Sequence, residues 1–233
     1  MNKLVKKLFT PFALFALALG VGMTISQPKD LVGAKAATEA VAYTTGFDSG
    51  EGFTAGTVYN NEEVAYSGPA GQQWGTYYGT PSTTSAIAGG QSMQMRAYKD
   101  NNDQGYTAMN FDIAKVTKVT FKAKNTTGIS VVASYSTDSG ANYVGAQTFA
   151  LTTTATEYTY NVSATGEFSL VRLKFQLHFA TTPTGTMRLY LDDVAIYSMQ
   201  DSVVTLESIS VSGTPKTSYF DGETFDPTGL TVT

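Results

Sequence analysis

The chain of 233 residues contains no cysteine, one histidine and one tryptophan. Without cysteine it can form neither a disulfide framework nor a zinc site built from Cys and His ligands. A Ser-His-Asp triad would have to use His178, and no Gly-x-Ser-x-Gly elbow for a nucleophilic serine occurs after residue 36. His178 lies on the polar side of an alternating segment, where a lone histidine is usually solvated. These absences argue against catalysis by this chain.

The first 36 residues have the pattern of an export signal. Three lysines among the first seven residues precede an apolar run from Leu8 to Met23, and Ala34-Lys35-Ala36 offers small residues for cleavage. The alternative is an uncleaved anchor, but a run of about 16 residues is short of the roughly 20 that span a bilayer. We therefore predict a cleaved signal peptide over 1–36, membrane contact only during export, and an extracellular or cell-surface location.

Positive charge is scarce in the rest of the chain. Residues 37–233 hold ten basic and eighteen acidic residues, a formal net charge of −8. A protein that binds nucleic acid through phosphates needs a basic surface to displace counterions. This composition therefore predicts no nucleic-acid partner for this region.

Alternation of apolar and polar residues dominates the region after residue 37. Met93, Met95 and Ala97 alternate with polar neighbours, and the segments 118–124 and 172–179 show the same period of two. No window after residue 40 keeps a helical period for more than two turns. We predict an all-β domain over 38–198, with eight or so strands in a two-sheet jelly-roll sandwich.

Three motifs in this domain resemble a known family. They are Gly46-Phe47-Asp48 with Glu51-Gly52-Phe53, the segment 90–96, and Leu-Tyr-Leu-Asp-Asp-Val-Ala-Ile at 189–196. Their order and spacing resemble the galactose-binding-like jelly-roll modules of secreted bacterial enzymes, many of which bind carbohydrate. The resemblance implies a non-catalytic module whose partner is a polysaccharide or a cell-surface glycan.

The same resemblance implies a structural calcium ion. In such modules calcium often ties the first strand to the last, which assigns the ligand role to Asp48 or Glu51 at one end and to Asp192 at the other. Carboxylate oxygens are the hard ligands that calcium prefers. The alternative is that Asp192 and Asp193 simply end in solvent at a strand edge.

Aromatic side chains provide the best candidates for ligand contact. The segment 72–79 is predicted to be a loop and contains Trp74, Tyr77 and Tyr78, whose flat rings could stack on a sugar. The alternative for Trp74 is a place in the core. Further hydrogen bonds could come from two strands if their faces meet on a concave sheet, through Gln94, Arg96, Lys174, Gln176 and His178.

Two other patterns have weaker implications. The segment 136–143 resembles the Asp-box hairpin, Ser-x-Asp-x-Gly-x-x-aromatic, and a single copy predicts a braced turn rather than a sialidase. A glycosidase would need two carboxylates about 5 to 9 Å apart. The candidate carboxylates are Glu51, Glu62, Glu63, Asp192 and Asp193. Their spacing in the sequence does not single out a pair, and we expect Glu62 and Glu63 to lie in a surface loop.

Residues 206–233 resemble the first part of a bacterial Ig-like domain, and 199–205 are predicted to be a linker. Two or three strands are too few to close a sandwich, so we expect this domain to continue beyond Thr233. Two functions therefore remain as alternatives to glycan binding. The chain could be the N-terminal appendage of a larger secreted hydrolase, a nuclease or a glycosidase, or it could be a structural or adhesive spacer.

Overall fold

The computed structural model describes residues 37–97, 104–126, 128–162, 169–182 and 184–201, and in the C-terminal part 211–213, 218, 220–224, 226 and 228–232. The predicted signal peptide, residues 1–36, lies outside the described residues. None of the helical segments that are described is long and apolar enough to cross a membrane.

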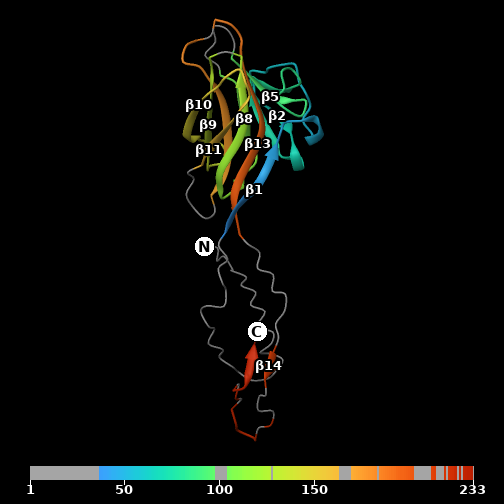
Figure 1. Ribbon diagram of the computed structural model, residues 1–233, viewed down its shortest axis with the longest axis vertical. Helices are drawn as coiled ribbons and strands as arrows, with labels where there is room; N and C mark the ends of the chain where they lie inside the picture. The colour runs from blue at the N-terminus through green and yellow to red at the C-terminus, as the bar shows by residue number, and fades with distance from the viewer. Residues whose placement is uncertain are drawn as a thin grey trace, which may run out of the picture. The chain divides into compact units, whose positions relative to one another are not determined.

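Two antiparallel sheets form the domain between residues 38 and 200 (Figure 1). The strands of the six-stranded sheet follow the order β11 (Thr156–Asn161), β8 (Val116–Asn125), β13 (Met187–Gln200), β5 (Ser92–Ala97) and β4 (Gly79–Ser82). Its sixth strand, β1 (Thr38–Thr45), also pairs with β13. The strands of the seven-stranded sheet follow the order β10 (Val144–Ala150), β9 (Ser130–Ser136), β12 (Leu170–His178), β6 (Tyr106–Met109), β3 (Gln73–Tyr77) and β2 (Val64–Ser67). Its seventh strand, β7 (Ile113–Ala114), also pairs with β12. Single 3₁₀ turns occur at η1 (Ser49–Glu51) and η2 (Pro69–Gly71).

The chain crosses repeatedly between the two sheets. The connections from β5 to β6, β8 to β9, β10 to β11, β11 to β12 and β12 to β13 all pass from one sheet to the other. Such crossing is the connectivity of a jelly-roll sandwich. The predicted all-β, two-sheet jelly-roll fold is confirmed.

The core lies between the sheets because each strand alternates. In β12 the burial pattern alternates at every residue from Val171 to His178, and β8 does the same over most of its length. Phe121 of β8 and Phe175 of β12 meet at 5.0 Å between ring centroids, so the apolar faces of the two sheets pack on each other. The predicted alternation in 118–124 and 172–179 is therefore confirmed. In 92–97 the apolar Met93, Met95 and Ala97 are buried as predicted, but Ser92 and Gln94 are buried too, so the polar side of this strand is also covered.

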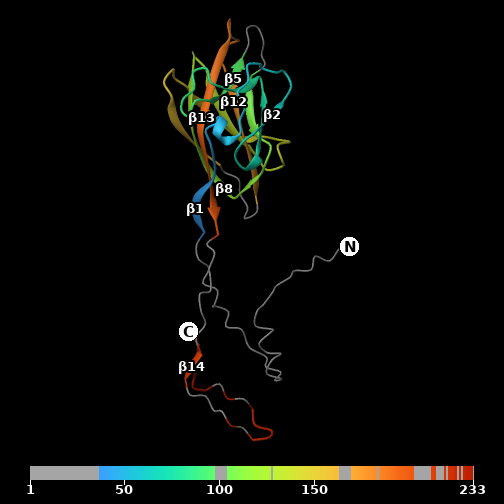
Figure 2. The same ribbon diagram turned by 90° about the vertical axis from the view of Figure 1, so that its right-hand side faces the viewer.

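Strand β13 occupies the middle of the six-stranded sheet and pairs with β1, β5 and β8 (Figures 1 and 2). The first and last strands of the domain are thus neighbours, with Thr38 opposite Gln200. A register shift follows Asp192, where Asp193 takes a left-handed φ of 46°. Because β13 continues to Gln200, residues 199 and 200 belong to the sheet and not to the predicted linker.

The described C-terminal residues include one short antiparallel pair. Strand β14 (Val211–Gly213) pairs with β15 (Leu230–Val232). This pair lies within the segment predicted to begin an Ig-like domain, and that assignment stays a prediction.

Candidate functional site

The only tryptophan is a core residue. Trp74 lies on β3 with no exposed surface, and its Nε1 donates a hydrogen bond to the Tyr43 hydroxyl at 3.1 Å. Its ring contacts Phe47 edge-on at 5.3 Å and stacks on Phe175 at 6.4 Å. The prediction that Trp74 contacts a ligand is wrong, because its side chain alternates inward.

The predicted loop over 72–79 is also wrong, since 73–77 form strand β3. Glycines suggested the loop, but Gly75 has another purpose. A Cβ at this position would lie 2.3 Å from Glu63 Oε1 and 3.0 Å from Asn110 Nδ2. Glycine therefore leaves room on the outer face of the sheet for two polar side chains.

The two predicted groups of hydrogen-bonding residues do not meet. Gln94 and Arg96 lie on β5 in the six-stranded sheet, whereas Lys174, Gln176 and His178 lie on β12 in the seven-stranded sheet. The outward faces of the two layers point away from each other. The prediction that these residues share one concave surface is therefore wrong.

Gln94 and Arg96 instead belong to a covered part of the six-stranded sheet. Gln94 is 1% exposed, and its Nε2 donates to the Tyr190 hydroxyl at 3.4 Å. The Arg96 guanidinium lies 4.4 Å from the ring centre of Tyr59 and 6.0 Å from that of Tyr78. Tyr78 therefore lies near Arg96, and its ring also meets the Tyr77 ring edge-on at 4.7 Å, at the margin of the surface described next.

A row of side chains crosses the outer face of the seven-stranded sheet. Tyr77 of β3 stacks on Tyr106 of β6 at 5.5 Å with an interplanar angle of 22°. The Lys174 ammonium of β12 lies 4.5 Å from the Tyr106 ring centre and 5.2 Å from that of Tyr143, which follows β9. Because β6 lies between β3 and β12, Tyr77 and Lys174 contact Tyr106 from opposite sides. We call Tyr77, Tyr106, Lys174 and Tyr143 the tyrosine–lysine row.

A cavity of about 430 Å³ opens beside this row. The Tyr106 hydroxyl donates to Glu63 Oε2 at 3.0 Å at its edge, and Asn110 adds an amide. The residues that line the cavity are Glu63, Tyr106, Ala108, Met109, Asn110, Ser139, Gly140, Ala141, Tyr143, Arg172 and Lys174. The cavity therefore combines aromatic surface with donors and acceptors of both charges.

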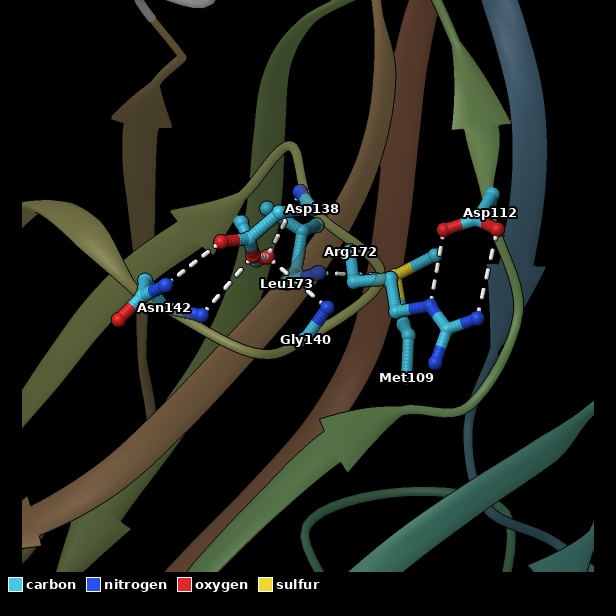
Figure 3. Close-up of polar contacts among 8 residues, drawn as sticks. Met109, Asp112, Asp138, Gly140, Asn142, Arg172 and Leu173 are labelled. Atoms are coloured by element: carbon cyan, nitrogen blue, oxygen red, sulfur yellow. Dashed lines mark hydrogen bonds and ion pairs between the residues drawn. The ribbon is translucent and has the colours of Figure 1, made fainter.

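Arg172 lines the cavity, and a salt bridge to Asp112 balances its positive charge. Its Nε and Nη2 donate to the two carboxylate oxygens of Asp112 at 2.8 and 3.3 Å (Figure 3). The hydrogen bond to Asp112 raises the pKa of Arg172. The pair fixes the side chain at the floor of the cavity rather than leaving a free cation.

Lys174 carries the uncompensated positive charge. No carboxylate of the described residues forms a salt bridge with its ammonium. Burial lowers the pKa of Lys174, and the nearby Glu63 charge counteracts part of this effect. For Tyr106, whose charged form is the anion, burial instead raises the pKa, and the hydrogen bond to Glu63 raises it further. The ammonium and the Glu63 carboxylate thus share one cavity without contacting each other.

The hairpin between β9 and β10 forms one wall of the cavity. Ser136 Oγ donates to Asp138 Oδ1 at 2.6 Å, and Asp138 accepts from the Asn142 backbone at 2.8 Å and its side chain at 2.7 Å. Hydrogen bonds from Ser136 and Asn142 lower the pKa of Asp138 to about 2. The predicted braced hairpin is confirmed.

Sequence patterns pointed to only part of this site. Of the residues predicted to contact a ligand, only Tyr77 and Lys174 lie in the tyrosine–lysine row. Glu63, predicted as surface, is exposed but accepts from Tyr106. Tyr143 could have been found as the aromatic residue that ends the Asp-box motif. His178 faces outward on β12, as predicted, opposite Ser130 and outside the cavity lining.

Two of the three predicted metal ligands converge. The carboxylates of Asp48 and Asp192 both lie close to Gly46: a Cβ atom placed on this glycine would be 3.0 Å from Asp48 Oδ2 and 3.3 Å from Asp192 Oδ1. Asp192 has no exposed surface and accepts only from neutral donors, Ser92 Oγ at 2.8 Å and the N–H groups of Ala88 and Asp193. Burial raises the pKa of Asp192.

The third predicted metal ligand, Glu51, uses its carboxylate in local hydrogen bonds. Its carboxylate accepts from the Thr45 hydroxyl and from the N–H groups of Gly46 and Asp48. No group of three His, Cys, Asp or Glu side chains suited to a metal ion occurs within the described part of the chain. Asp48 and Asp192 could supply two carboxylates to a calcium ion, which takes about six to eight oxygen ligands, so the others would have to come from elsewhere.

No protein-family model matches the chain, and no curated protein matches it. Among solved structures, the chain is similar to a family 4 carbohydrate-binding module, with 19% identity, 53% of this chain and 92% of that chain covered, and a TM-score of 0.39. It is similar to a mutant family 29 module complexed with mannohexaose, with 17% identity, 69% and 92% covered, and a TM-score of 0.40. It is also similar to a family 61 module in complex with β-1,4-galactotriose, with 12% identity, 54% and 88% covered, and a TM-score of 0.39.

Proposed function

We propose that the outer face of the seven-stranded sheet binds a polysaccharide or a cell-surface glycan. The observation that supports this most directly is the cavity in which Lys174 and Glu63 lie beside the rings of Tyr106 and Tyr143. Sugar sites typically combine flat apolar surface with a few placed polar groups.

The polar groups of the cavity suit hydroxyl groups. A sugar hydroxyl donates one hydrogen bond and accepts others, so it can accept from the Lys174 ammonium and donate to the Glu63 carboxylate. Asn110 can do both. Because Asp112 neutralises Arg172, the described residues that line the cavity leave one charge of each sign without a salt bridge, on Lys174 and Glu63, which favours a neutral ligand rich in hydroxyls.

Binding without catalysis is the function that this geometry supports. Hydrolysis of a glycosidic bond needs two carboxylates that flank the ligand. Among the described residues that line the cavity, Glu63 is the only carboxylate. We therefore favour a binding module over a glycosidase.

Tyr143→Ala tests this proposal. In the full chain, we expect the affinity for a glycan found by array screening to fall by at least about tenfold, since truncating an aromatic contact costs on the order of 2 kcal/mol. Tyr197→Ala is the matched control, because Tyr197 also packs under a lysine, Lys118 at 4.6 Å, but lies on the other sheet. Failure of the wild-type chain to bind any glycan would overturn the proposal.

We also propose that calcium binds between Asp48 and Asp192 and ties β1 to β13. A cation would relieve the cost of a fully buried carboxylate that neutral donors alone now hold. Calcium would act there as a structural ion that stabilises the fold.

Removal of calcium is expected to lower the melting temperature by roughly 5 to 10 °C if the ion is present at about 100 times its Kd. Differential scanning calorimetry with EDTA and with added calcium measures this shift. Asp192→Asn keeps the acceptor for Ser92 but should abolish the response to calcium. A melting temperature that changes with neither EDTA nor added calcium would contradict the proposed calcium site.

We propose further that the module acts outside the cell. The lysines and apolar run within 1–36 support export, and a chain without cysteine does not depend on disulfide formation after it.

A further inference from the structure

We propose that Ser136 and Asp138 are positioning residues that hold the hairpin wall of the glycan cavity and thereby set its affinity. This inference rests on the proposed function. It assigns a binding role to a motif that otherwise accounts only for a turn.

The hairpin provides a large share of the cavity lining. Ser139, Gly140, Ala141 and Tyr143 line the cavity, and the Lys174 ammonium lies over the Tyr143 ring at 5.2 Å. A Cβ on Gly140 would lie 3.4 Å from the Tyr143 hydroxyl and 3.7 Å from Arg172 Cδ. The position of the hairpin backbone therefore decides where the Tyr143 ring stands.

The hairpin backbone needs support to keep this shape. Ser139 has a φ of 60° and Gly140 a φ of 90°, both in the left-handed region. A non-glycine residue in this region is costly and persists only where its surroundings enforce it. Ser136 and Asp138 supply that enforcement.

Ser136 Oγ accepts from the N–H groups of Asp138 at 3.2 Å and of Gly140 at 2.9 Å, while it donates to Asp138 Oδ1. Asp138 in turn holds both the backbone and the side chain of Asn142, the residue before Tyr143. Together they fix the turn on both sides of its two left-handed residues.

Neither residue lines the cavity. Ser136 has no exposed surface, and Asp138 is exposed on the outside of the hairpin. Any effect of their substitution on glycan binding must therefore pass through the hairpin and Tyr143. This separates a positioning role from direct contact with the ligand.

Ser136→Ala in the full chain is the main test, because it removes three hydrogen bonds without changing any charge. We expect the Kd for the glycan to rise on the order of tenfold, since the bond that Ser136 donates to the Asp138 carboxylate is charge-assisted. The second readout is the pKa of Tyr143, followed by NMR on ¹³C-tyrosine and assigned with Tyr143→Phe. Burial raises the pKa of Tyr143, so a loosened hairpin should bring it down toward its ordinary value.

A comparison of Asp138→Asn with Asp138→Ala gives the conservative rescue. Both remove the Asp138 charge, which raises the pKa of Tyr143, as do the charges of Glu63 and Asp112, whereas the positive charge of Arg172 lowers it. Only the asparagine keeps an acceptor for Ser136 and for the Asn142 backbone. We expect Asp138→Asn to bind several-fold more tightly than Asp138→Ala.

Asn125→Ala controls for a general loss of stability. Asn125 bonds the carbonyls of Ile129 and Leu151 at 2.9 and 3.2 Å, at the opposite end of β9 and β10 from the hairpin. It should lower the melting temperature but leave both the Kd and the pKa of Tyr143 unchanged. A wild type that binds, with a Ser136→Ala variant that binds equally well, overturns the positioning role alone. A wild type that binds no glycan overturns the proposed function and this role together.

Discussion

Trp74→Ala is expected to lower the free energy of unfolding by about 3 to 5 kcal/mol. The ring is completely buried and packs against Phe47 and Phe175, so its removal leaves a cavity between the two sheets. It also takes away the donor to the buried Tyr43 hydroxyl. Chemical denaturation followed by far-UV circular dichroism measures the loss.

Trp74→Phe is the matched variant, because it keeps an aromatic ring and should cost clearly less. Tryptophan emission should also stay unchanged when a glycan binds, since the ring has no contact with the outer face of the sheet. A Trp74→Ala chain that keeps wild-type stability but no longer binds glycan would contradict the assignment of Trp74 to the core.

Lys174→Met is expected to weaken glycan binding by more than tenfold while leaving stability unchanged or slightly higher. Truncation of a placed, charged donor at a binding site commonly costs more than 1.4 kcal/mol, or about tenfold. Stability should not suffer, because the half-buried ammonium has no salt bridge within the described residues and methionine fills a similar volume. Isothermal titration calorimetry and thermal melting separate the two effects.

Lys118→Met provides the control for this prediction. Lys118 also lies over a tyrosine ring, that of Tyr197, but on the six-stranded sheet, and it pairs with Glu39. We expect it to leave glycan affinity unchanged. Full affinity in Lys174→Met would show that the ammonium does not contact the ligand.

Local patterns predicted much of this fold. The alternation along 118–124 and 172–179 identifies which residues face the core, because the period of two is a property of the strand itself. The Asp-box hairpin is equally local, since all of its hydrogen bonds lie within residues 136–142. For such features the sequence neighbours are also the spatial neighbours.

The site was harder to predict because it depends on strand order. Tyr106 meets Glu63, 43 residues away, only because β2, β3 and β6 are neighbours in one sheet. Gln94 appeared equivalent to Lys174 by alternation, yet β5 and β12 belong to different sheets. Alternation indicates that a residue faces outward, but not which sheet it is on. For Trp74, the flanking glycines indicated a loop, although one of them serves to make room for Glu63.

The central place of β13 also bears on how the domain folds. β13 is the last strand of the sandwich to be synthesised, yet β1, β5 and β8 all need it as a hydrogen-bonding partner. The six-stranded sheet therefore cannot be completed until residues 187–200 are available to pair. Contacts between such distant segments slow folding, so the domain folds late and as one unit rather than progressively from its N-terminus.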